Sequence, residues 1–230
     1  MYNLDIATSD RDYFIVFCED TRALMSASAP QSHYGFYPLK EMVVDKADIA
    51  EGSAIELSRF LDSCIKGTVR ALECLFATRG IVYQSPVWQY IAQQLRPSIV
   101  SQQAVGKFLG FADSHLHKLR RAESGQSEKA SFRRRKLVYH AAKKLFDLRT
   151  MALGKAPVIT LADESSERRF ILEARNGEID LEQAIVDVNR ERQNVVALLR
   201  QHECDVPPLV ERTALQRLLR IVRAVFCPRD

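Results

Sequence analysis

The hydrophobic positions change their spacing along this chain, from short apolar runs to the three-and-four spacing of helices. An aromatic and β-branched run at 12–17 predicts a strand, and the apolar run at 41–45 predicts a second one. Residues 21–40 hold Ser, Pro, His, Tyr and Gly and predict an irregular connection. The stretch 54–76 alternates at its start like a strand and then continues with helical spacing, broken near Gly67.

From Ser85 onward the pattern is helical almost throughout, apart from a short strand predicted at 158–161. The sequence therefore predicts an α+β protein, with a small sheet-containing domain over 1–80 and a helical domain over 81–230. The predicted helices run from Ser85-Pro86 to Pro97, over 98–121, over 129–153 with Gly154 as cap, over 165–174, over 181–202 with Asp180 as cap, and from Leu209 to Phe226.

Two carboxylates stand at the start of the first predicted strand. Asp10 and Asp12 are two residues apart, so on an extended backbone they project to the same side, with Arg11 turned away. Two adjacent hard oxygen ligands suit a Mg²⁺ ion that bridges the phosphates of a nucleotide. The other interpretation of the same residues is a polar turn with solvated charges.

Three blocks of sequence resemble the polymerase-β-superfamily nucleotidyltransferases, and most closely the group of predicted nucleotidyltransferases linked to RNA repair. The family pattern Tyr-Gly-Leu, a few residues, then Ser-Asp-x-Asp-Tyr is followed from Tyr2 onward, with Asn3 where a small residue is common. The order and spacing of the blocks carry the resemblance, which covers most of the chain. The blocks are Tyr2–Tyr13, then Ile55–Leu61 with Lys66-Gly67 and Leu72–Phe76, and lastly Lys136–His140 with Leu153-Gly154.

The resemblance implies a palm-like domain over 1–80 and transfer of a nucleoside monophosphate from an NTP to a hydroxyl, with release of pyrophosphate. It implies Mg²⁺ or Mn²⁺ held by Asp10, Asp12 and a third carboxylate on a neighbouring strand, for which Glu56 is the candidate by position. The alternative role of Glu56 is that of an exposed acid at a helix N-terminus. The acceptor is RNA, such as tRNA or broken RNA ends, or a protein hydroxyl, and the residues leave this choice open.

The remaining predicted contacts to nucleotide or RNA are basic or polar. Arg133, Arg134 and Arg135 form a basic run that suits a nucleic-acid backbone, within a locally basic stretch from 118 to 149. Lys136, His140 and Lys144 share one helix face, where stacked cations are unfavourable unless an anion is near. A solvated basic face with His140 half-buried is the other interpretation. The residues expected to contact nucleotide phosphate are Ser9, Lys136, His140 and Lys144.

The chain departs from the family pattern at its start. The Gly-Ser pair that cradles the triphosphate in the family would precede Tyr2, where this chain has Met1. A Gly52-Ser53 pair follows the carboxylates and is interpreted as a turn before a helix. Either the chain is a truncated form or the cradle has been lost. In the second case it is an inactive relative that binds nucleic acid or a protein partner.

Composition limits the remaining functions. The chain has 230 residues, 47% of them hydrophobic, which suffices for a core, and no apolar run approaches the roughly 20 residues of a membrane span. No secretory signal is present, so a cytoplasmic protein without membrane contact is expected. The five cysteines are scattered and predict free thiols rather than zinc or disulfides. No P-loop or dinucleotide motif occurs, which excludes those kinases and dehydrogenases.

Overall fold

The computed structural model describes residue 4 and residues 12–19, 33–36, 51–121, 128–202 and 206–226. Within them the chain is a mixed α/β protein, mostly helical with a small mixed sheet, which confirms the α+β expectation at that level. The predicted site residues Ser9 and Asp10 and the predicted strand at 41–45 lie outside the described residues. The strands are β1 (Asp12–Phe17), β2 (His33–Phe36) and β3 (Glu51–Glu56). The helices are α2 (Leu57–Ile65), α3 (Val69–Phe76), α4 (Pro86–Leu95), α5 (Gln102–Arg121), α6 (Glu128–Met151), α7 (Ser166–Asn176), α8 (Leu181–Gln201) and α9 (Arg212–Phe226).

The sheet has the order β1-β3-β2, with β1 parallel and β2 antiparallel to β3. Its register pairs Asp12 with Glu51 at one end and Phe17 with Glu56 at the other. Two predictions for this region are wrong. His33–Phe36 is a strand inside the stretch expected to be irregular, and Gly52-Ser53 lies within β3 instead of forming a turn.

Most helix boundaries follow the local capping signals. The Ser85 side chain accepts a hydrogen bond from the Trp88 amide at 3.2 Å, and Pro86 occupies the first turn of α4. The Asp180 carboxylate accepts from the Gln183 amide at 3.0 Å in the same way at the start of α8. The apolar run at 158–161, however, is not a strand. It is a connecting segment that buries Ile159 and Leu161.

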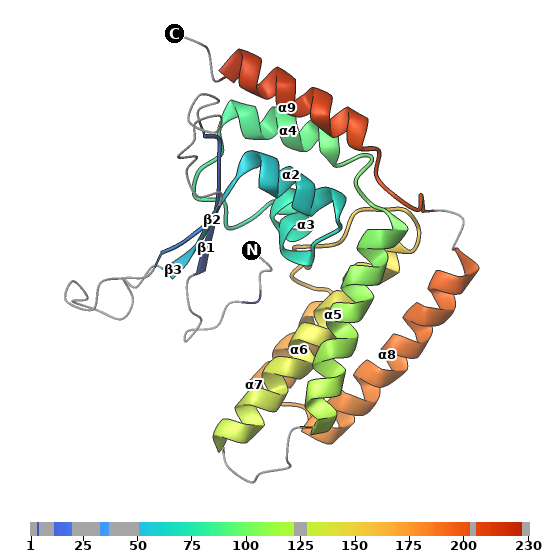
Figure 1. The fold of residues 1–230 in the computed structure, drawn as a ribbon. Helices are drawn as coiled ribbons and strands as arrows, with labels where there is room; N and C mark the ends of the chain where they lie inside the picture. The colour runs from blue at the N-terminus through green and yellow to red at the C-terminus, as the bar shows by residue number, and fades with distance from the viewer. Residues whose placement is uncertain are drawn as a thin grey trace, which may run out of the picture.

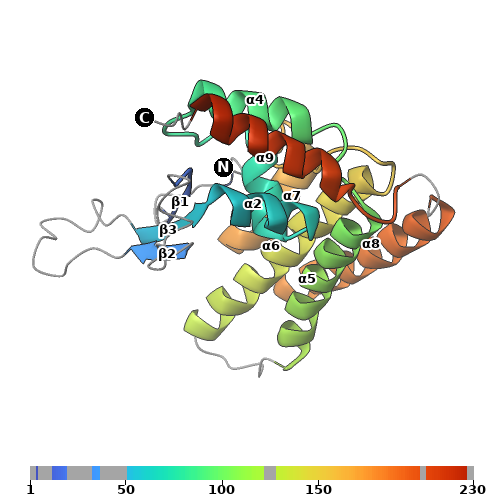
Figure 2. The same cartoon turned by 45° about the horizontal axis from the view of Figure 1, so that its top comes forward.

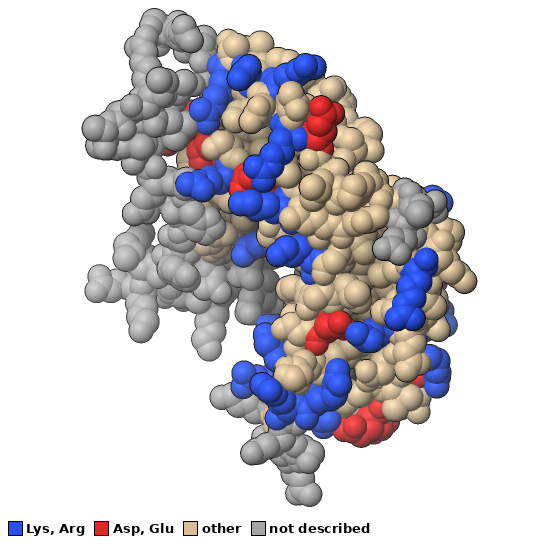
Figure 3. All heavy atoms as spheres, turned by 45° about the vertical axis from the view of Figure 1, so that its right-hand side comes forward, with Lys and Arg blue, Asp and Glu red and all other residues tan. Residues whose placement is uncertain are grey.

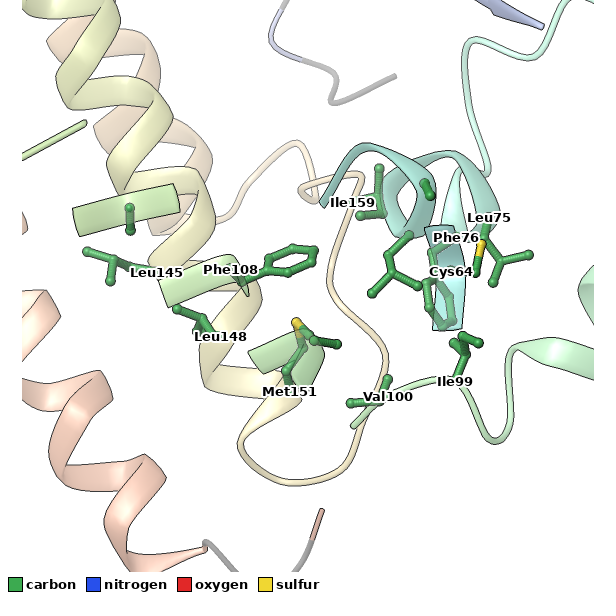
Figure 4. Close-up of a cluster of buried hydrophobic side chains, with 14 of the residues drawn as sticks. Cys64, Leu75, Phe76, Ile99, Val100, Phe108, Leu145, Leu148, Met151 and Ile159 are labelled. Atoms are coloured by element: carbon green, nitrogen blue, oxygen red, sulfur yellow. The ribbon is translucent and has the colours of Figure 1, made fainter. Parts of the chain in front are cut away.

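A single cluster of buried apolar side chains extends across the predicted domain boundary at residue 80. Leu75 from α3 and Ile99 lie in the same cluster as Phe108 from α5 and Leu148 from α6, and all four are fully buried (Figure 4). Burial of one such side chain contributes about 1.5–3 kcal/mol relative to exposure. The sheet-bearing part and the helical part are therefore joined by shared core.

The helices form two groups. The long helices α5 and α6 pack along each other, and α7 and α8 pack against α6 (Figure 1). At the other end of the molecule α4 and α9 lie side by side above α2, and the sheet stands to one side of them (Figure 2). No helix among the described residues combines the length and the apolar character needed to cross a membrane.

Candidate functional site

A cavity of about 830 Å³ lies between β1, α3 and α6. Its volume falls in the range of small-molecule sites. One wall is residues 13–16 of β1, and the rim includes Ile81, Val82 and Tyr83, whose side chains are exposed. The other lining residues are Val69, Arg70, Glu73, Cys74, Ala77, Gly80, Ser85, Trp88, Phe111, Tyr139, His140, Lys143 and Lys144.

Leu4 and Asp12, on either side of the segment that carries Asp10, both lie near residues that line this cavity. Leu4 is buried, and its carbonyl accepts a hydrogen bond from Nη1 of Arg175 at 2.6 Å. The same guanidinium lies 5.4 Å from the ring centroid of Tyr139, which lines the cavity. At the other end Asp12 begins β1, whose next four residues also line it. Leu4 is thus linked to a cavity residue through Arg175, and Asp12 directly precedes the lining residues of β1.

Glu56 does not lie beside Asp12, so the strand register gives no support to its predicted place in the metal site. It pairs with Phe17 at the far end of the parallel strands, five residues from the Asp12 pairing, or about 17 Å along the sheet. Its carboxylate caps α2 by accepting from the Ser58 amide at 2.7 Å, and Arg223 of α9 donates to it at 3.0 Å. The alternative prediction of a helix N-terminal position for Glu56 is confirmed, but the side chain is only 1% exposed, so the predicted exposure is wrong.

The sheet places a different acid next to Asp12. Glu51, the first residue of β3, is the register partner of Asp12 on the neighbouring parallel strand. Sequence reasoning missed it because strand direction and register cannot be read from a single strand pattern. Among the side chains that the structure describes, no group of three His, Cys, Asp or Glu could hold a metal ion, and neither Asp12 nor Glu51 is among those side chains.

A buried ion network forms the wall of the cavity on α6. Lys144 pairs with Glu73 of α3 and lies 3.4 Å from Asp147, while Lys143 donates to Asp147 at 2.6 Å and to the Val158 carbonyl at 2.7 Å. Burial lowers the pKa of both lysines, and the Asp147 carboxylate opposes this shift. The network balances two cations with two carboxylates and fastens α6 to α3 and to the 155–161 segment.

The three members of the predicted phosphate-binding face on α6 occupy different environments. Lys136 is exposed and does not line the cavity, Lys144 is buried in the ion network, and His140 is half-buried on the cavity wall. Burial lowers the pKa of His140 to about 4, with smaller contributions from His115, Lys136 and Arg175. The imidazole is therefore uncharged at pH 7, and a role for His140 as a cation toward phosphate is not favoured.

The basic run Arg133–Arg135 has partners within the protein. Arg134 pairs with Glu182 of α8 at 2.8 Å, and Nη1 of Arg135 donates to the carbonyls of Ala174 and Ile179. Arg133 is exposed. On the face in Figure 3, Lys and Arg are spread over both ends of the molecule and are not gathered in one patch. The contacts of Arg134 and Arg135 are accounted for by the fold, and contact of the run with nucleic acid stays a prediction.

Arg70 is a cavity residue that sequence reasoning missed. Its guanidinium lies 4.9 Å from the ring centroid of Phe14, and it has no carboxylate partner among the described side chains. Arg70 is also in the first turn of α3, where the helix dipole disfavours a cation. That position is the signal in the sequence that could have identified it as an anion-binding residue.

Thiol chemistry is not favoured in this cavity. Cys18, Cys64 and Cys74 are free thiols, as predicted, and of these only Cys74 lines the cavity. Burial raises the pKa of Cys74 to about 12, so it stays protonated and weakly nucleophilic at pH 7. The chemistry of the site therefore rests on carboxylates, cations and imidazole.

No family model, no curated protein and no solved structure matches this chain.

Proposed function

We propose that the protein is a metal-dependent nucleotidyltransferase with a palm-like sheet, resembling the RNA-repair-associated members of the polymerase-β superfamily. The observation that carries the proposal is the position of the cavity. It is lined by residues 13–16 of β1, directly after Asp12, and by Tyr139, whose ring lies beside the Arg175 side chain that holds Leu4. A cavity whose β1 wall directly follows Asp12, and which contains the Arg70 cation without a carboxylate partner among the described side chains, suits a nucleotide.

The acidic residues at the start of β1 and β3 fit a divalent cation by their donor chemistry. Asp10, Asp12 and Glu51 supply hard carboxylate oxygens, which Mg²⁺ and Mn²⁺ prefer, and Glu51 replaces Glu56 as the third carboxylate because of its register with Asp12. When bound, the metal ion neutralises phosphate charge and lowers the pKa of the attacking hydroxyl.

The residues of the chain then bind and orient the reactants. Arg70 neutralises the phosphates of the NTP from the α3 side of the cavity. The acceptor hydroxyl oxygen forms a bond to the α-phosphorus, the bond between that phosphorus and the bridging oxygen breaks, and pyrophosphate leaves. The hydroxyl proton passes to a carboxylate of the acidic set. The balanced network around Lys144 keeps the wall of the site rigid during the transfer.

Transfer of label from each α-labelled NTP, with Mg²⁺ or Mn²⁺, onto total RNA and onto protein tests the proposal. The assay is run on this chain and on one extended at its N-terminus by the upstream coding sequence. Replacement of Asp10 and Asp12 by Asn should lower transfer at least 100-fold, and Glu51→Gln should do the same. The matched control is Glu56→Gln, which removes an acid from the same strand and should keep transfer at temperatures where the variant is folded.

The outcomes separate the functions. Loss of transfer in Glu56→Gln but not in Glu51→Gln would contradict the assignment of the third carboxylate. No transfer from either wild-type chain would contradict the enzyme proposal and favour the inactive relative that binds nucleic acid or a protein partner. The labelled product identifies the acceptor as RNA or protein.

A further inference from the structure

Half-buried rings form one side of the cavity. Phe111 and His115 of α5 stack with ring centroids 4.4 Å apart and planes at 27°. On α6, the rings of Tyr139 and His140 are 4.0 Å apart, and His140 is 5.4 Å from His115. None of these four rings is fully buried, and Phe111, Tyr139 and His140 line the cavity. Each of these three rings therefore keeps part of its surface accessible, and the Arg175 guanidinium lies over the Tyr139 ring, 5.4 Å from its centroid.

The two histidines of the wall differ in what they can still bind. Nδ1 of His115 lies 2.9 Å from the Phe111 carbonyl, and because a carbonyl only accepts, this nitrogen carries the proton. The His140 ring makes no hydrogen bond to another described residue. Its charged and titratable neighbours are Lys136 on α6, His115 on α5 and Arg175 on α7, and together with burial they keep it uncharged. An uncharged imidazole offers one donor and one acceptor.

The spacing along α6 separates an aromatic end of the cavity from a charged end. His140 and Lys144 are one helical turn apart, about 6 Å along the axis. Glu73 and Arg70 of α3 lie on the cavity wall with Lys144. A ligand with a planar ring at one end and an anionic group at the other matches this arrangement, whereas a purely anionic ligand leaves the ring wall unused.

We propose that Tyr139 and His140 form the subsite for the planar base of a nucleotide, with Tyr139 stacking on the ring and His140 hydrogen-bonding its edge. This inference rests on the proposed nucleotidyltransferase function for the identity of the ligand. It goes beyond that function because it assigns the base to α6, away from the carboxylates of the sheet. Stacking accepts any base, so selectivity among bases depends on His140.

The fluorescence of Trp88 provides a measurement of ligand binding. Trp88 is the only tryptophan of the chain and it lines the cavity, so its fluorescence reports ligand binding without a label. The full chain is titrated with adenosine, guanosine, cytidine and uridine, which carry a base and no phosphate, and with inorganic tripolyphosphate, which carries phosphate and no base. The wild-type chain should bind at least one nucleoside, and tripolyphosphate should bind independently of Tyr139.

The variants separate stacking from hydrogen bonding. Tyr139→Leu should weaken nucleoside binding about tenfold, whereas the matched control Tyr139→Phe keeps the ring and should stay within about twofold of wild type. His140→Phe should keep nucleoside binding and lose the differences among the four nucleosides. Tripolyphosphate binding should be unchanged in all three variants and weakened in Arg70→Met.

Each result bears on a different claim. Tripolyphosphate binding without nucleoside binding in the wild-type chain would overturn the base subsite and leave the proposed transfer reaction standing. Equal nucleoside affinity in Tyr139→Leu and Tyr139→Phe would also overturn it. If circular dichroism shows that Tyr139→Leu does not fold, His140→Phe provides the test of the base subsite. Unchanged differences in affinity among the four nucleosides in that variant would overturn the subsite. Nucleoside binding together with absence of metal-dependent transfer would support the subsite and contradict the enzyme.

Discussion

His140 gives the stability of the protein a pH dependence that can be measured. Its pKa is about 4 in the folded protein and 6.5 in the unfolded chain, so unfolding takes up a proton between these pH values. The contribution of His140 to the free energy of unfolding is therefore fully present above pH 6.5 and is lost as the pH falls toward 4. Between pH 7 and pH 4.5 the loss attributable to this one group is about 2 kcal/mol.

Urea unfolding at the two pH values tests this prediction. Between pH 7 and pH 4.5, the free energy of unfolding of wild type should fall by about 2 kcal/mol more than that of His140→Gln. The exposed His117, on the α5 face away from the cavity, supplies the control, because His117→Gln should leave the pH dependence of wild type unchanged. If the free energy of unfolding has the same pH dependence in wild type and in His140→Gln, the folded protein does not depress the pKa of His140.

The Glu73–Lys144 pair allows a second test at the residue scale. Both side chains are buried, so removal of one leaves an uncompensated charge that costs about 3 kcal/mol. Glu73→Leu and Lys144→Met should each lower the free energy of unfolding by about that amount. The double variant leaves Lys143 with Asp147 as a balanced pair and should recover about 2 kcal/mol relative to Glu73→Leu.

A double-mutant cycle by urea denaturation measures the coupling between the two side chains. Additive losses in the double variant would contradict a buried pair and place both side chains in contact with water. Because the pair joins α3 to α6 across the cavity, a large coupling would also show that the two walls of the candidate site are held together in solution.

At the scale of elements, Gly67 sets how α2 and α3 meet α5. It has a φ of +66°, and a Cβ at this position would lie under 3.0 Å from the backbone of Ala104 in α5. Gly67→Ala should therefore lower the melting temperature strongly, with a loss of at least about 2 kcal/mol. In Gly106 and Gly110 the added Cβ meets nothing within 4 Å, so Ala should stabilise α5 by about 0.5–1 kcal/mol at each position.

Thermal unfolding of the three variants provides the comparison. The contrast between one glycine and the other two removes the general effect of adding a methyl group, because only Gly67 combines positive φ with a backbone contact. A small effect of Gly67→Ala, similar in size to that of Gly106→Ala, would mean that the chain packs differently around the end of α2.

Local signals predicted the helices and the strand at 12–17, but not β2 or the pairing of the strands. Ser85 and Asp180 cap their helices through contacts within three residues, and the Gly67 break is a property of one backbone position, so a single sequence suffices to place them. β2 has no alternating pattern, and it is a strand only because β3 lies next to it. The run at 158–161 buries Ile159 and Leu161 as part of the core, and it forms no strand ladder.

For the whole molecule, the candidate site depends on contacts that no local pattern encodes. Of the three α6 residues predicted as a group because they share a helix face, His140 and Lys144 line the cavity and Lys136 does not. Arg70 joins them only because α3 packs against that helix, and Glu51 is the register partner of Asp12 only because β3 runs parallel to β1. Long-range packing and strand direction therefore decide which charges meet, and these follow from the complete fold.

Arg175 connects the helical part of the molecule to the segment with the candidate carboxylates. Its guanidinium contacts the Leu4 carbonyl and the face of the Tyr139 ring, so it links Leu4 to the cavity wall. Under the proposed function, Arg175→Met should raise the KM for NTP about tenfold or more, because a displaced carboxylate segment loses orientation of the substrate. Arg169, exposed on the same helix, supplies the matched control Arg169→Met.

Steady-state transfer assays together with thermal unfolding separate this effect from simple destabilisation. Arg175→Lys keeps the charge but not the planar fork, so it should recover only part of the lost NTP affinity. A fall in melting temperature with an unchanged KM would mean that Arg175 stabilises the fold and does not contribute to NTP binding. An unchanged KM and melting temperature would mean that Leu4 is held at the cavity by its own burial in the core, which accounts for its position without the hydrogen bond.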